Sequence, residues 1–162
     1  PWTFVRRAAA TALGAAPKSA AIDARIAAAM LNEEQPSVRV EMLEALGKRG
    51  ASAQAEAVRE RALDEGEALN VRLKAVEAIG LLCDRGSADA LTELAMRGRA
   101  PLFETDRKLA VLGILTLGKL RPADLKERLA PLLAKESSPE MRELATKTIA
   151  DAAVAGAAVC KP

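Results

Sequence analysis

The chain has 162 residues, half of them hydrophobic but only 2% aromatic, and a formal net charge of +2 from 24 basic and 22 acidic residues. This length is typical of one domain that can bury a sizeable core, and a core of Ala, Leu, Ile and Val favours helices over strands. The composition therefore argues against a polyanion-binding surface and a membrane span, and the lack of histidine removes the commonest catalytic base and metal ligand.

One ten-residue pattern occurs three times, at residues 5–14, 38–47 and 71–80. Each copy begins with Val-Arg and ends with an aliphatic residue followed by glycine. The arginines stand at positions 6, 39 and 72, so both steps are 33 residues, and looser copies follow around Arg107 and Arg142 with steps of 35. A constant period of this size predicts a repeat architecture, in which each unit buries its apolar face against its neighbours.

In chain order, each unit is predicted to contain helix A, a glycine-containing turn, helix B and a polar link. The units span approximately residues 4–35, 36–68, 69–103, 104–138 and 139–162, and together they form a single all-α domain. Apolar residues recur at helical spacing in helix A of the third unit and in helix B of the fourth. The fifth unit is predicted to contain a helix A at about 139–155 and a short alanine-rich tail.

Residue types at the expected helix boundaries support this division. Ser19, Ser52 and Ser87, with Pro122 in the fourth unit, each lie 20 residues before the next arginine, and serine is a favoured N-cap. The glycines that close the pattern, at positions 14, 47 and 80, are expected to end helix A in the left-handed conformation. Pro131 should kink the fourth helix B or shift its end.

The pattern of Val-Arg, small apolar residues, Ala-Leu-Gly and a second helix resembles HEAT-like repeats, especially the short-period variety named after phycobilisome lyases. The resemblance extends from about Phe4 to Ile149 and is closest in the first three units. It implies a right-handed α-solenoid of about four to five helical hairpins, with helix A on the convex side and helix B lining a concave groove. It identifies no activity, because one fold supports many functions.

The most regular polar feature is the series Arg6, Arg39, Arg72, Arg107 and Arg142. A series of cations could bind a ligand, but it repeats with the fold, so we expect a structural role in which each arginine bridges to acidic residues of the preceding link. The acidic residues available for this are Glu33, Glu34, Glu65, Glu67, Glu104 and Glu136.

The predicted function is a non-catalytic scaffold that binds a protein partner through the helix-B groove, with no metal and no cofactor. Mixed charge on these helices suggests electrostatic selection of the partner. The candidate contacts are Asp23, Glu56, Arg59, Asp89, Glu93, Lys126 and Glu127.

Two alternative functions belong to other classes. The first is nucleic-acid binding of the kind seen in HEAT-like DNA glycosylases, for which Arg97, Arg99, Arg107 and Lys108 would supply charge. Interleaved acidic residues and the scarcity of aromatic side chains argue against it. The second is a lyase-type enzyme, for which Cys83 is the internal candidate nucleophile. We expect Cys83 to be a packing residue instead.

The chain ends supply three further expectations. Trp2 and Phe4 should cover the exposed end of the stack, or else mark an interface. Because the sequence starts at Pro1 and shows no signal peptide, a fragment or processed product is expected. Cys83 and Cys160 lie two units apart, about 16–20 Å for stacked helices, so the thiols are predicted to be free, which favours the cytoplasm.

Overall fold

The computed structural model describes residues 2–154 and 160. Over these residues it is helical, without a strand, so the all-α prediction is confirmed. None of the described helices is long and apolar enough to cross a bilayer. The chain separates into two compact units, residues 1–82 and 83–162, each of which is described by itself.

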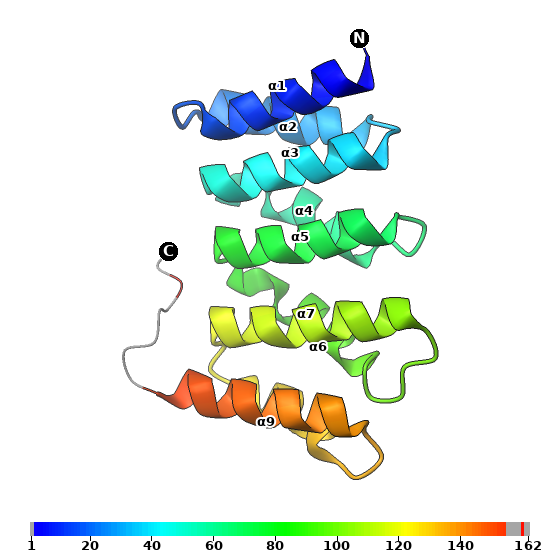
Figure 1. The fold of residues 1–162 in the computed structure, drawn as a ribbon. Coiled ribbons are helices and arrows are strands. Elements are labelled where there is room, and N and C mark those ends of the chain that lie inside the picture. The colour runs from blue at the N-terminus through cyan, green and yellow to red at the C-terminus, as the bar shows by residue number, and fades with distance from the viewer. Residues whose placement is uncertain (1, 155–159, 161–162) are drawn as a thin grey trace. The chain divides into compact units, whose positions relative to one another are not determined.

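The first unit is a two-layer arrangement of five α-helices. These helices are α1 (Thr3–Ala15), α2 (Ala20–Leu31), α3 (Pro36–Arg49), α4 (Ala55–Leu63) and α5 (Leu69–Leu82). Helix α3 packs between α1 and α5, while α2 packs on α3 and α4 packs on α5 (Figure 1). The first layer therefore contains the predicted A helices, and α2 and α4 are the predicted B helices.

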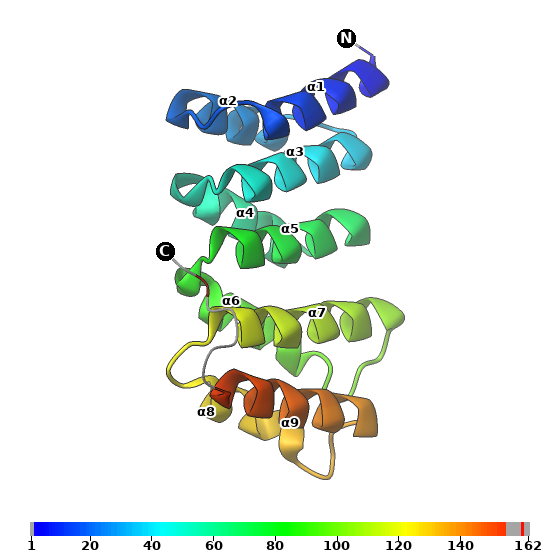
Figure 2. The ribbon, with the colours of Figure 1, turned by 60° about the vertical axis from the view of Figure 1, so that its left-hand side comes forward.

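The second unit repeats this plan with less regular B helices. It contains α6 (Ala88–Met96), α7 (Glu104–Leu120), α8 (Leu125–Leu129) and α9 (Pro139–Ala153). Helix α7 packs on both α6 and α9, and α8 contacts α6, α7 and α9 (Figure 2). Helix α9 ends two residues before the predicted boundary, and its start at Pro139 is confirmed.

The core consists of the apolar positions that the repeat pattern selects. Val71, Ala75, Val76, Ala78 and Ile79 are completely buried in α5, which confirms the predicted stripe. The fourth helix B is shorter than the pattern suggests, because α8 stops at Leu129 and a 3-10 turn follows over Ala130–Leu133. Pro131 lies at the start of that turn, where its missing amide proton does not break an α-helical hydrogen bond.

The predicted role of the repeat glycines is wrong. Helix α3 continues past Gly47 to Arg49, and the left-handed residue is Gly50, with φ at 65°. One period later, Cys83 is left-handed as well, with φ at 55°. Gly47 instead permits close packing, since an added Cβ would lie 3.3 Å from Ala78 Cα on α5.

The serine series marks the second helices but does not cap them. Ser19 is the N-cap residue of α2 by position, yet its side chain accepts no capping hydrogen bond. Short 3-10 turns at Ser52–Gln54 and Arg85–Ser87 lead into α4 and α6. The Ser87 hydroxyl donates to the Asp84 carboxylate, and Asp84 accepts from the Gly86 amide at 3.1 Å. An aspartate cap therefore replaces the predicted serine cap.

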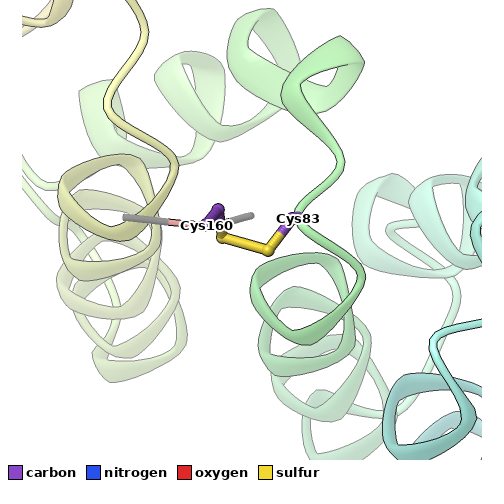
Figure 3. Close-up of a disulfide and its surroundings, with 2 residues drawn as sticks. All are labelled: Cys83 and Cys160. Carbon is purple, nitrogen blue, oxygen red and sulfur yellow. A yellow bond between two sulfur atoms is a disulfide. The ribbon is translucent and has the colours of Figure 1, made fainter. Parts of the chain in front are cut away.

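The prediction of free thiols is also wrong, because Cys83 and Cys160 form a disulfide within the second unit (Figure 3). Their Cα atoms are 5.3 Å apart, well inside the range that a disulfide requires. The helix-spacing estimate applies only to residues within stacked helices, and Cys160 lies beyond the end of α9 at Ala153. The cytoplasmic expectation rested on free thiols and loses that basis.

Candidate functional site

Three arginines of the repeated pattern, Arg39, Arg72 and Arg142, bind main-chain carbonyls of the preceding B helix or link. Arg39 donates to the Glu33 carbonyl, and Arg72 donates to the Ala62 carbonyl at 3.1 Å. Arg142 donates to the carbonyls of Lys135 and Ser137, at 2.8 and 3.1 Å. Guanidinium groups thus satisfy acceptors that the ends of the B helices and the links leave open.

Arg6 and Arg39 also bind a carboxylate of the link that follows their own helical hairpin. The expected partners were acidic residues of the link that precedes it. Arg6 Nε is 2.6 Å from Glu33, and Arg39 is 2.7 Å from Glu67. The hydrogen bond from Arg6 holds the pKa of Glu33 below its usual value. In the second unit Arg107 pairs with Glu104, three residues earlier in α7, at 2.6 Å and with Glu140 near the start of α9 at 2.8 Å.

These contacts connect consecutive repeats and occupy the guanidinium groups. Glu67, for example, retains only 2% of its side-chain exposure beside Arg39. A ligand would have to displace these internal partners before it could reach the arginines. The series therefore offers no ready-made anion site.

Sequence reasoning missed a second arginine site, formed by Arg49 in the first unit. Its side chain is 1% exposed and donates to the Asp23 carboxylate. It also donates to the carbonyls of Leu13, Ala16 and Pro17, at 2.8, 2.9 and 3.1 Å. Arg49 thus holds the turn between α1 and α2. Its register equivalent in α5 is Leu82, so the repeat pattern gave no signal for it.

Asp23 is therefore a structural residue, and it is a weaker candidate for partner contact than the sequence suggested. Of the other candidates in the first unit, Glu56 is exposed on α4 and Arg59 is half-buried there. The structure places Asp23 on α2, where its carboxylate accepts a hydrogen bond from Arg49 of α3.

In the second unit, the candidates from α6 and α8 share one layer. Arg128 on α8 bonds Asp89 on α6 at 2.6 Å and Thr92 at 3.2 Å. Its Nε also donates to the Asp124 carboxylate at 2.8 Å, and this hydrogen bond is the main reason that the pKa of Arg128 is raised and that of Asp124 lowered. Arg128 had not been singled out from the sequence, although its spacing of four residues from Asp124 favours an ion pair.

The remaining charges of that layer project into solvent. Glu93 on α6 retains 61% of its side-chain exposure beside Arg97, at 3.3 Å. Lys126 and Glu127 on α8 are exposed. We call Glu93, Lys126 and Glu127 the α6/α8 charged face. The predicted basic cluster is not a uniform positive patch, since Arg107 and Lys108 both contact Glu104.

An apolar concavity lies between α1 and α2, with Met42 of α3 also in its wall. It has a volume of about 300 Å³, and its walls are almost entirely hydrophobic. The lining residues are Arg6, Ala9, Ala10, Leu13, Ile22, Arg25, Ile26, Ala29 and Met42. Trp2 and Phe4 stand at the start of α1, 74% and 63% exposed, with ring centroids 5.6 Å apart.

The described residues contain no group of three His, Cys, Asp or Glu side chains that could hold a metal ion. Cys83, the candidate nucleophile of the lyase alternative, is bonded to Cys160 and is not a free thiol here. A scan of protein-family models finds no match, and a search of curated proteins finds no relative. The function is therefore inferred from the arrangement of the residues in this chain.

Proposed function

We propose that this chain is a HEAT-like repeat module, a right-handed α-solenoid of about four to five hairpins, that binds a protein partner without catalysing a reaction. The contact residues lie on B helices, and in the second unit they form the α6/α8 charged face. The observation that supports this most is the link from Arg128 to Asp89, which joins α6 to α8 and leaves Glu93, Lys126 and Glu127 exposed.

The chemistry of this face suits a folded or helical protein of mixed charge. The face contains two acidic groups and one lysine, so a partner with complementary charges is selected, while a uniform polyanion gains little. Within the first unit taken by itself, Glu56 and Arg59 give α4 a similar mixture of charges. Encounter with such a partner should slow as salt is added, because exposed charges are screened.

Site-specific photo-crosslinking tests the proposal. A photoreactive residue in place of Glu127 should give one discrete, saturable adduct with a protein partner. An excess of this chain without the photoreactive residue should prevent that adduct by competition. Lys147 is the matched control, since it is exposed on α9 in the layer of A helices. The charge reversals Glu93→Lys and Lys126→Glu should reduce the adduct from position 127 without altering the circular dichroism spectrum.

The outcomes distinguish the classes of partner. Equal adducts from positions 127 and 147, or adducts insensitive to both charge reversals, would contradict the α6/α8 assignment. An adduct that nuclease removes would replace the protein partner with a nucleic acid.

We also propose that the module works in an oxidising compartment. The Cys83–Cys160 bond supports this, because structural disulfides persist outside the reducing cytosol. Non-reducing mass analysis after rapid alkylation of the protein in its native cells tests the idea. Alkylation of both cysteines would contradict it and restore the cytoplasmic expectation.

A further inference from the structure

The Cys83–Cys160 disulfide joins the two ends of the second unit. Cys83 is the first residue of that unit, which runs from residue 83 to residue 162, and Cys160 lies near its other end. Helices α6, α7, α8 and α9 therefore all lie within the covalent loop that the bond closes. The first unit, residues 1–82, lies outside this loop and contains neither of the two cysteines of the chain.

A covalent loop stabilises the segment that it encloses. It lowers the entropy of that segment in the unfolded state, and the effect grows with the length of the loop. Here the bond joins positions 77 residues apart. Unfolding of the first unit does not open this loop, so reduction of the bond should destabilise the second unit selectively.

The backbone at Cys83 shows that a cysteine is unfavourable there without the bond. Its φ of 55° lies in the left-handed region, which glycine adopts readily and other residues adopt at a cost. Gly50 occupies the same position one period earlier, at the end of α3. In the oxidised protein the disulfide offsets the cost at Cys83. After reduction the cost remains, while the stabilisation from the bond is lost.

The ion pairs between helices of the second unit lie at its surface. Glu140 and Asp89, which bind Arg107 and Arg128, retain 52% and 91% of their side-chain exposure. Exposed pairs of this kind contribute little to stability. In the first unit, by contrast, the side chain of Arg49 connects α3 to α2 and is almost completely buried. The second unit therefore depends more strongly on its covalent bond.

The bond is accessible to a reductant, because both cysteines are half-buried and thiolate attack requires access to a sulfur atom. One thiolate of a dithiol attacks one sulfur of the bond, forms a mixed disulfide and releases the other cysteine as a thiolate. The second thiolate of the dithiol then attacks the mixed disulfide and releases the first cysteine. Two electrons and two protons thereby pass to Cys83 and Cys160, and the dithiol becomes a disulfide.

We propose that the Cys83–Cys160 bond is a redox-sensitive latch on the second unit. Reduction by a dithiol makes helices α6 to α9 open far more often, while the first unit stays folded. The α6/α8 charged face belongs to the second unit, so reduction also weakens binding there. This last consequence rests on the proposed function, whereas the opening of the second unit does not.

Hydrogen exchange of the full chain, measured by mass spectrometry with and without excess dithiothreitol, tests the latch. Amides of α7 and α9 should exchange about 30- to 700-fold faster after reduction, as expected for the loss of a disulfide that closes a long loop. Amides of α3 should change by less than about threefold, because the loop does not enclose them. Both sets of rates should return to their original values when the dithiol is removed and the bond re-forms.

The variant Cys83→Ser/Cys160→Ser is the matched control. Its α7 and α9 amides should exchange as fast as those of the reduced wild-type protein, and dithiothreitol should have no effect on them. Equal acceleration in α3 and α7, or no acceleration in either, would overturn the proposal. A bond that excess dithiothreitol leaves intact in the native protein, shown by alkylation and mass analysis, would overturn it as well.

The photo-crosslinked adduct from position 127 separates this inference from the proposed function. The adduct should decrease on reduction, and this decrease should be reversed when the bond re-forms. If the oxidised protein gives no adduct while the exchange rates respond as expected, the proposed function fails and the latch stands.

Discussion

At the residue scale, Arg49 shows how one buried side chain can hold a turn. It donates to four carbonyl groups, those of Leu13, Ala16, Pro17 and Ser19, and neutralises Asp23 while it is almost inaccessible to water. Methionine has a similar volume but no donor, so Arg49→Met leaves the carboxylate and the carbonyls without this partner. We expect a loss of about 3 kcal/mol in the free energy of unfolding, measured by urea denaturation.

Lys48→Met is the control for this prediction, because Lys48 lies on the same turn but is 59% exposed and forms a surface pair with Glu44. It should cost at most about 0.5 kcal/mol. Equal losses in the two variants would mean that the Arg49 contacts do not stabilise the turn.

A second residue-scale prediction concerns pH. The pKa of Glu33 is lowered in the folded state, mainly by the hydrogen bond from Arg6, so its stabilising contribution is complete above the unfolded pKa, near 4.3. That contribution is lost as the pH falls through the lower folded-state pKa. Glu33→Gln should therefore reduce stability at pH 7 and flatten the decline in Tm below about pH 4.3.

Arg6→Met provides the coupled control for the acid limb. It removes the main cause of the pKa shift and should flatten the decline in the same way, and the double variant should add no further flattening. If Glu33→Gln keeps the full acid dependence of the wild-type protein, the Arg6–Glu33 pair is not its source.

At the element scale, the distance between neighbouring A helices depends on residues without a side chain. A Cβ added to Gly118 on α7 would lie 2.6 Å from Thr148 Cγ2 on α9, and Thr148 is buried and β-branched. Gly118→Ala should therefore destabilise the protein by about 1–3 kcal/mol. At an unobstructed helix position the same change would stabilise by about 1 kcal/mol, so the sign is diagnostic.

Thr148→Ser tests the cause, because it removes only the methyl group that the new Cβ would strike. In a double-mutant cycle measured by thermal unfolding, Thr148→Ser should recover most of the loss caused by Gly118→Ala. Simple additivity of the two changes would show that α7 and α9 are not limited by this contact.

At the scale of the whole molecule, the disulfide connects positions 77 residues apart and ties Cys160 to the start of the second unit. Closing a loop of that length removes much of the entropy of the unfolded chain. The double variant Cys83→Ser/Cys160→Ser should lose about 2–4 kcal/mol of stability by urea denaturation. Reduced wild-type protein should match the variant, and two reactive thiols in unfolded, unreduced protein would contradict the bond.

How much of this could be predicted from the sequence differs between local and long-range features. The helical period and the apolar stripe of α5 follow from which residues must face a core, and both can be read directly from spacing. The same spacing placed Gly47 near a helix end, but it could not show that Ala78 of the next helix requires the absence of a Cβ there. Close approach between two helices depends on the residues of both, and the sequence of one helix does not show which residue of the other it meets.

The sequence by itself determined the all-α class, the order of A and B helices and the place of each repeat arginine near the start of a helix A. Helix propensity and a repeated apolar period act locally, so both can be read from the sequence. Only the tertiary structure decided the partners: the Arg49 site, the direction of the Arg6–Glu33 pair and the Cys83–Cys160 bond. These contacts join residues 26 to 77 positions apart. Their formation depends on where packing brings each chain segment, which no local preference specifies.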